Sequence, residues 1–228
     1  MKPLQRTTYD ISQIIVYEDE DIMVCHKPAG LPVQTKKLTQ KDLESLLKTH
    51  LANTTKQPSP YLGVINRLDQ PVEGLVLFAK NQKAAAELTR QLTTGQIVKE
   101  YLAITSALPA NSAQTLTDYL VKDGKNNLSK IVDPSVKDAK KAILDYTVII
   151  SNSQRALLQI SLKTGRHHQI RVQMANMGTP LLGDTKYGGK SADSLCLCAS
   201  HLAFCHPVTL KQLDFNIQPQ NPEYKAYL

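Results

Sequence analysis

The chain has 228 residues, 42% apolar and 21% charged, which is the composition of a folded globular protein and excludes a disordered one. No apolar stretch approaches the roughly 18 to 20 residues of a membrane span, and no apolar segment follows Lys2 and Arg6 as it would in a secretory signal. Lys and Arg number 27 against 20 Asp and Glu, a net charge of +7 that favours polyanionic partners, nucleic acid first. These features predict a cytoplasmic enzyme or binding protein.

Apolar periodicity and turn residues predict the elements of the first half of the chain. Two short strands are expected between Ile14 and Val24, and the Pro and Gly of Lys27-Pro28-Ala29-Gly30 end the second. A helix is expected after Thr39-x-x-Asp42, which resembles a capping box. The run 75–79 is typical of a buried strand, and the helix after it is expected to start at Asn81 and end near Gly95.

The second half is predicted to be richer in strands. The expected elements are strands at 97–104, 142–150 and 155–162, a hairpin within 106–141, a helix over 166–177 that Gly178 ends, and strands near 195–199 and 213–217. Many strands and few helices predict an α+β fold, with a mostly antiparallel mixed sheet and flanking helices, and not a doubly wound fold. We expect one domain over residues 1–228, with its core at about 14–217.

A cluster near the C-terminus raises the possibility of a zinc site. Its members are Cys196, Cys198, His201, Cys205 and His206, and the fourth cysteine of the chain is Cys25. The spacing does not match the paired pattern of zinc knuckles, and 195–199 is typical of a small apolar strand in which free cysteine packs as a hydrophobe. We therefore expect no metal and no disulfide framework.

A polar loop leads into the predicted buried strand at 75–79. It contains Asn66-Arg67-Leu68-Asp69, with Pro71 and Gly74 fixing the path of the backbone. A carboxylate held beside cationic groups stays ionised and is a candidate nucleophile or base. The alternative is that Asp69 caps its own turn, as aspartates in loops often do.

Two further segments carry candidate site residues. Tyr101 lies within a predicted strand, where a tyrosine either packs in the core or stacks on a nucleobase. In Thr164-Gly165-Arg166-His167-His168-Gln169-Ile170-Arg171-Val172, basic residues crowd a predicted helix start, which is typical of a phosphate site. His167 and Arg171 are four apart and are expected to share a helix face.

Taken together, these segments resemble the RluA family of RNA pseudouridine synthases. Residues 66–69 resemble its His-Arg-Leu-Asp motif, Lys99-x-Tyr101-x-Ala103 its tyrosine motif, and 164–172 its Thr-Gly-Arg-x-His-Gln-Ile-Arg-Val motif. Residues 27–30, 180–188 and 206–209 resemble its opening, intermediate and closing motifs. The resemblance runs from about Ile14 to Phe215 and is similar to the short members that consist of the catalytic domain, so no S4 domain is expected.

The resemblance implies conversion of a specific uridine of ribosomal or transfer RNA to pseudouridine, through base flipping and without a cofactor. It assigns catalytic roles to Asp69, to Tyr101, which would stack on the base and help remove its C5 proton, and to Arg171, which would pair with Asp69. It implies that Arg67 fills the gap left by the flipped base. Further RNA contacts are expected from Asn66, Arg166, His167 and Gln169. RNA is the expected partner, without a membrane or an obligate protein partner, and the protein is expected to be a monomer.

Two departures from the family pattern affect the loop that would meet RNA. Asn66 stands where the family has His, and Gln70-Pro71-Val72-Glu73-Gly74 stands where it has Arg-Asp-Thr-Ser-Gly. Glu73 is expected to place a negative charge near the polyanion, at a small electrostatic cost. These changes motivate one alternative, an RNA-binding or folding protein with little turnover. A zinc-dependent nucleic-acid enzyme using the cluster at 196–206 is a further alternative.

Overall fold

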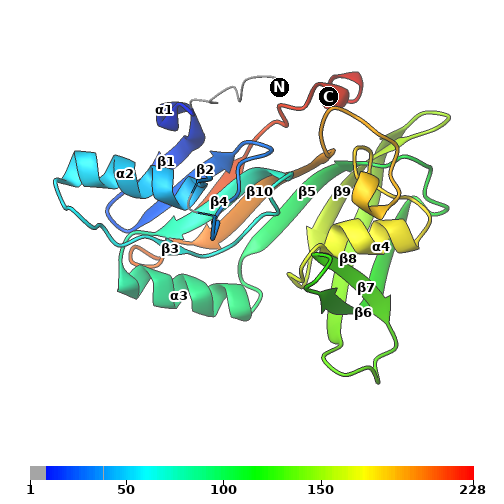
Figure 1. Cartoon of the computed structure of the whole chain (residues 1–228), viewed down its shortest axis with the longest axis horizontal. Coiled ribbons are helices and arrows are strands. Elements are labelled where there is room, and N and C mark those ends of the chain that lie inside the picture. Colours follow the sequence, from blue (N-terminus) through cyan, green and yellow to red (C-terminus); the bar gives the residue numbers. More distant parts are fainter. Residues whose placement is uncertain (1–8, 38) are drawn as a thin grey trace.

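The computed structural model describes residues 9–37 and 39–228, and it is built around one mixed β-sheet (Figure 1). The strands are β1 (Ile15–Glu18), β2 (Ile22–Lys27), β3 (Gly63–Val64), β4 (Glu73–Ala79), β5 (Val98–Ile104), β6 (Ala113–Asp123), β7 (Leu128–Val132), β8 (Lys140–Ser151), β9 (Ala156–Leu162), β10 (Leu197–Cys205) and β11 (Gln212–Asn216). Their order across the sheet is β1-β2-β4-β10-β5-β9-β8-β6-β7, with β3 on β4 and β11 on β10. Among these strands β4 and β10 pair in parallel and the other pairs are antiparallel. The prediction of an α+β fold with a mostly antiparallel sheet is confirmed.

Within the described ranges, six helical segments flank the sheet. They are α1 (Ile11–Ile14), α2 (Leu43–Thr55), α3 (Gln82–Thr93), α4 (Gln169–Asn176) and the 3-10 helices η1 (Thr185–Tyr187) and η2 (Pro222–Ala226). Asn81 caps α3 as expected, because its side chain accepts the backbone N–H of Ala84. The cap of α2 is Asp42 and not Thr39, since the Asp42 carboxylate accepts the N–H of Ser45. In the described residues no helix has the length and apolar character that a membrane crossing requires.

The helices cover opposite faces of the sheet. In Figure 1, α2 and α3 lie on either side of the strands β2, β4 and β10, and α4 lies beside β7 and β8. The apolar residues of α2 and α4 join one core, and those of α3 join a second core on the other face. The C-terminal η2 adds Tyr224 to a third cluster.

The alternation of strand side chains assigns each residue of β4 to one face. Val76 and Phe78 belong to the core under α2 and α4, and Leu75 and Leu77 belong to the core under α3. By the same period of two, Tyr101 on β5 faces the α2 and α4 side. All of β4 is buried, as its continuous apolar run predicts.

Two predicted boundaries are wrong, for identifiable reasons. The helix expected over 166–177 begins only at Gln169, because His168 adopts a left-handed conformation with φ of +52°. His167 therefore precedes the helix and does not share a helix face with Arg171. The strand expected at 195–199 spans Leu197–Cys205, because residues 201–205 pair with β11 and residues 201–203 also pair with β5.

Gly74 on β4 lies directly against the backbone of Ala199 on β10. Its φ is +132°, and a Cβ built there would lie 2.4 Å from the backbone nitrogen of Ala199 on β10. We predict that Gly74→Ala lowers the free energy of unfolding by about 3 to 5 kcal/mol, since steric overlap adds to backbone strain. Gly178→Ala is the matched control, because Gly178 also has a positive φ but has open space around it. Urea unfolding of both variants measures the difference, and equal losses would contradict the overlap at Ala199.

Candidate active site

The loop that carries Asp69 is clamped just before β4. The N–H of Val72 donates to the carbonyl of Asp69 at 3.0 Å, which closes a turn. The carbonyl of Gln70 accepts from the N–H of Gly30 at 2.9 Å and from Lys27 Nζ at 3.2 Å. The Gln70 amide in turn donates to the carbonyl of Gly30 at 3.0 Å. The expected turn around Asp69 is therefore held by the segment after β2 and not by the aspartate side chain.

Lys27 is the buried centre of this clamp. Its ammonium also donates to the carbonyls of Pro28 and Leu31, at 3.0 and 2.8 Å, so all three of its donors have partners. Burial lowers the pKa of Lys27 to about 7, against the opposing effect of the charges on Asp69 and Glu73. Lys27 therefore belongs to the support of the loop, and it is not available to bind RNA.

Arg171 joins two carboxylates in the space below this loop. Its Nη1 lies 3.3 Å from Asp69 Oδ2, and its Nε and Nη2 donate to the two oxygens of Asp184 at 2.8 and 2.7 Å. Burial alone would lower the pKa of Arg171, but the hydrogen bonds and charge of Asp184 and the charge of Asp69 raise it above its usual value. A permanently charged guanidinium thus faces Asp69, as the sequence implied, but its main partner is Asp184.

His168 reaches the same oxygen of Asp69 from the other side. Its Nε2 lies 3.4 Å from Asp69 Oδ2, and its Nδ1 lies 2.8 Å from the hydroxyl of Tyr187. The Tyr187 hydroxyl also accepts the N–H of Ser129 at 2.8 Å, and its ring lies 5.2 Å from the Arg171 guanidinium carbon. Burial and the charge of Arg171 lower the pKa of His168 to about 3, so the imidazole is neutral at physiological pH.

The hairpin of β6 and β7 touches the site through His167. The His167 ring stacks on His168 with 3.8 Å between ring centres, and its Nδ1 lies 2.9 Å from the Ser129 hydroxyl. Its Nε2 lies 3.1 Å from Asn127 Oδ1. Burial lowers the pKa of His167, and the ring is only partly exposed. His167 thus links the hairpin to the site more than it presents a free cation to RNA.

Tyr101 lies on β5 in the core beneath the same face. Its side chain is buried, and burial together with the charge of Asp69 raises its pKa far above the usual value. The phenol is therefore neutral, and among the described residues no group forms a hydrogen bond with its hydroxyl. The ring is packed in the core on the face of the sheet that carries α4.

The expected RNA-binding residues divide into exposed and internal ones. Arg67 and Arg166 are exposed, and the Nε of Arg166 donates to the carbonyl of Lys141 at 2.9 Å. Asn66 is occupied by β4, since its amide donates to the carbonyl of Leu75 and its oxygen accepts the N–H of Leu77. The geometry gives Asn66 a structural role on β4, and its expected RNA contact stays a prediction.

Gln169 also has internal partners. It is buried, its Oε1 accepts from the Thr164 hydroxyl and from the N–H of Arg166, and its Nε2 donates to the carbonyl of Ile143. These bonds hold the loop before α4 in place. Gln169 therefore shapes the surface that presents Arg166, and its amide oxygen and one of its two amide N–H donors are engaged within the protein.

Glu73 does not place its negative charge on the surface, contrary to the expectation from the sequence. It is buried, and its Oε1 accepts the backbone N–H of Gln220 at 2.6 Å and lies 3.2 Å from His26 Nε2. Because β4 alternates, Glu73 lies on the face of Leu75 and Leu77, opposite the core of Tyr101. Its charge ties the C-terminal segment to the sheet.

The five residues of the candidate zinc cluster point to different partners. His201 lies between Glu100 and Asp214, at 3.2 and 3.0 Å, whereas His206 contacts Asp19 at 2.9 Å. Burial raises the pKa of both Cys196 and Cys198, which disfavours the thiolate that zinc requires. The geometry therefore contradicts a zinc-dependent enzyme built on 196–206.

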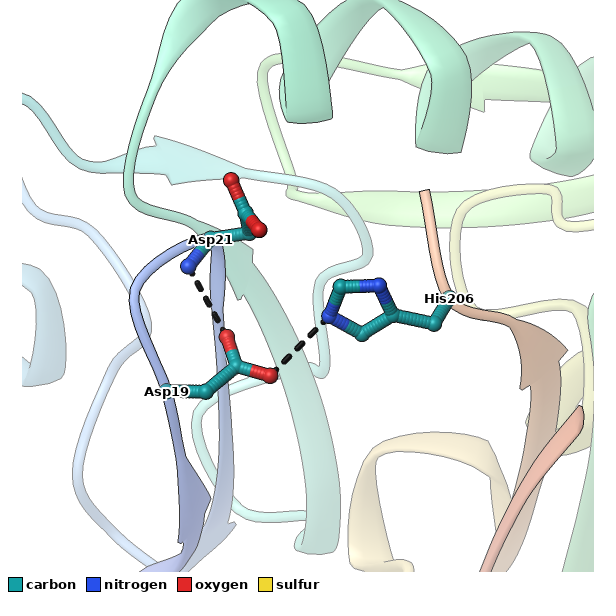
Figure 2. Close-up of side chains that lie close together, drawn as sticks. All are labelled: Asp19, Asp21 and His206. Carbon is teal, nitrogen blue, oxygen red and sulfur yellow. Dashed lines mark hydrogen bonds and ion pairs between the residues drawn. The ribbon is translucent and has the colours of Figure 1, made fainter. Parts of the chain in front are cut away.

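Among residues 9–37 and 39–228, Asp19, Asp21 and His206 form the one gathering of possible metal ligands (Figure 2). The Nδ1 of His206 accepts the N–H groups of Val208 and Thr209, so its Nε2 carries the proton that Asp19 accepts. Both oxygens of Asp19 are occupied, because they also accept from the Tyr17 hydroxyl and from the N–H groups of Asp21 and Ile22. This cluster is a hydrogen-bond network that joins the β1–β2 turn to the β10–β11 turn.

Three residues of the site had no role in the sequence interpretation. They are His168, Asp184 and Tyr187, all of which contact Arg171, Asp69 or each other. Asp184 and Tyr187 lie in the matched stretch 180–188, but nothing in their spacing indicates that they reach a residue on α4. A buried arginine does require a carboxylate partner, and that requirement was the one signal that pointed to Asp184.

The fold and this site define the class of protein. A human structure titled RNA Pseudouridylate Synthase Domain Containing 4 superimposes with a TM-score of 0.77 over 92% of this chain and 90% of its own, at 24% identity. The family model for RNA pseudouridylate synthase matches residues 21–176. Ribosomal large subunit pseudouridine synthase D of Zymomonas mobilis is 33% identical over 96% of this chain and 74% of its own length. The protein of that name from Vibrio cholerae is 32% identical over 91% of this chain and 67% of its own.

The chain belongs to the RNA pseudouridylate synthase family. It is an isomerase that acts on uridine in RNA, and its relatives include RluA-type enzymes. The expected family and reaction class are confirmed, and the alternative of a binding protein without turnover loses its support.

Substitutions of Arg171 and Arg166 are predicted to affect different quantities, the turnover rate and the RNA affinity respectively. We expect Arg171→Met to lower the single-turnover rate on RNA by roughly 100-fold with less than about a threefold change in Kd, because Arg171 is buried against Asp69 and Asp184. Arg166→Met is the matched variant at an exposed arginine. It should weaken RNA binding and reduce the slope of log Kd against log salt by about 0.9, the value for one phosphate contact. Reversed behaviour of the two variants would contradict these roles.

Proposed function

We propose that Asp69 is the catalytic carboxylate that acts on the target uridine. The observation that carries this proposal is that Asp69 is partly exposed, at 26%, whereas the arginine that holds it is only 6% exposed. The carboxyl group is thus accessible from solvent while its orientation is set from within the protein. In the reaction the N1–C1′ bond breaks and a C5–C1′ bond forms, N1 regains a proton and C5 loses one, so no oxidant or other reactant is consumed.

Arg171, Tyr101 and Arg67 have separate proposed roles around Asp69. Arg171 keeps Asp69 oriented through a charged hydrogen bond at 3.3 Å. Tyr101 offers a rigid ring on which the uracil rests, and its neutral hydroxyl is a hydrogen-bond partner for the base as C5 loses its proton. Arg67 is exposed two residues before Asp69 and has no ion pair within the described residues, which suits it to fill the gap that the flipped uridine leaves.

We further propose that the substrate is ribosomal or transfer RNA, with large-subunit ribosomal RNA favoured by the names of the relatives from Zymomonas and Vibrio. We propose a single catalytic domain, since one continuous sheet joins the described elements from β1 to β7, and we propose that it acts as a monomer. A cytoplasmic location agrees with the four cysteines, all free. Comparing pseudouridine maps of ribosomal and transfer RNA from cells with and without the gene identifies the target uridine.

Asp69→Asn is the test of the catalytic assignment. The amide preserves size but lacks the charge, so we expect turnover to fall by at least roughly 10,000-fold while the protein stays folded and binds RNA. Asp133→Asn is the control, because Asp133 is an exposed loop aspartate remote from Arg171 in sequence and without an ion pair to it. Pseudouridine formed per enzyme in a single turnover is the measurement, and an active Asp69→Asn variant would rule out Asp69 as the catalytic group.

A further inference from the structure

The contacts on the Asp69 carboxylate are unequal. Both Arg171 Nη1, at 3.3 Å, and His168 Nε2, at 3.4 Å, lie against the same oxygen, Oδ2. In the described part of the chain, no hydrogen bond or ion pair reaches the other oxygen, Oδ1. Arg171 and His168 thus both contact Oδ2, while Oδ1 has no partner among the described residues.

The tautomer of His168 follows from its neighbours. The Tyr187 hydroxyl accepts the Ser129 N–H, so its own proton is free to be donated to His168 Nδ1 at 2.8 Å. A neutral imidazole that accepts at Nδ1 carries its proton on Nε2. That Nε2 lies 3.4 Å from Asp69 Oδ2, so a chain of contacts runs from Ser129 through Tyr187 and His168 to Asp69.

His168 has a backbone conformation that is unfavourable for a residue with a Cβ atom. It is one of five non-glycine residues with a positive φ in the described chain, and its side chain is 4% exposed. His167 stacks on one side of the ring, and the edge of the ring meets Tyr187. Strain of this kind persists only where surrounding contacts enforce it, and here they aim Nε2 at Asp69.

We propose that His168 is a positioning residue that, with Arg171, fixes Oδ2 of Asp69 so that Oδ1 is the oxygen presented to the uridine. The proposal rests on the catalytic role of Asp69. The 3.4 Å separation is long for a hydrogen bond, and such contacts tighten when substrate closes a site. The β6–β7 hairpin enters the same chain of contacts through Ser129, so it supports the catalytic carboxylate from a distant part of the sequence.

Replacing His168 by Asn and by Gln separates its backbone role from its side-chain role. Asn tolerates a positive φ and offers polar atoms near the place of Nδ1, but it is too short to reach Asp69. Gln extends its amide nitrogen to about the place of Nε2. We expect His168→Asn to bind RNA within about threefold of the wild type but to be slower by roughly 10- to 100-fold in a single turnover, and His168→Gln to regain most of that rate. His50→Asn is the control, because His50 lies on α2 and its ring contacts Glu18 at 3.2 Å.

Several outcomes would overturn the proposal. These are a His168→Asn variant as fast as the wild type, or a folded His168→Gln variant as slow as the Asn variant. If neither variant folds, Tyr187→Phe asks the same question, because it removes the hydroxyl that sets the tautomer; a reduced rate with unchanged Kd supports the proposal and an unchanged rate overturns it. An inactive Asp69→Asn beside a fully active His168→Asn would refute the positioning role alone, whereas an active Asp69→Asn would refute the catalytic assignment on which it rests.

Discussion

The site depends on one buried guanidinium shared between two carboxylates. A buried arginine without partners would be very costly, and Asp184 removes that cost by accepting two hydrogen bonds in the bidentate geometry that arginine prefers. The remaining Nη1 is then directed at Asp69. Asp184 is 1% exposed and Asp69 is 26% exposed, so the first carboxylate is internal and the second is accessible from solvent.

The fold brings the parts of this arrangement together from distant segments. Asp69 precedes β4, Arg171 lies on α4, and Asp184 precedes η1. The loop of Asp69 is fixed to the segment after β2 by Lys27, and the start of β4 can approach β10 only because residue 74 is glycine. The sheet therefore sets the distance between the carboxylate and the helix that carries its arginine.

Much of the fold follows from local sequence patterns, and the exceptions have physical causes. Asn81 and the apolar run of β4 define their elements correctly because capping and burial are local properties. The start of α4 was missed because His168 takes a conformation that only its neighbours in space enforce. Similarly, the extension of β10 depends on pairing with β5 and β11, which are far away in sequence.

The site shows the same division between motif and tertiary contact. The motifs led to Asp69, Tyr101 and Arg171, and the geometry brings Asp69 and Arg171 into contact. Glu73 was expected near RNA because the sequence does not show that it is the first residue of β4 or which face of that strand it joins. Asn66 and Gln169 look like polar surface residues in sequence, but their amides satisfy backbone groups that no local pattern reveals.

The anchoring of Arg171 by Asp184 is most directly tested by the single-turnover rate of Asp184→Asn, measured together with its RNA affinity. An amide cannot accept both arginine donors through charged oxygens, so Arg171 would lose its fixed direction toward Asp69. The account predicts a rate lower by roughly 100-fold with Kd changed by less than about threefold. A folded Asp184→Asn enzyme with the wild-type rate would contradict it, because Asp69 would then be held without the shared guanidinium.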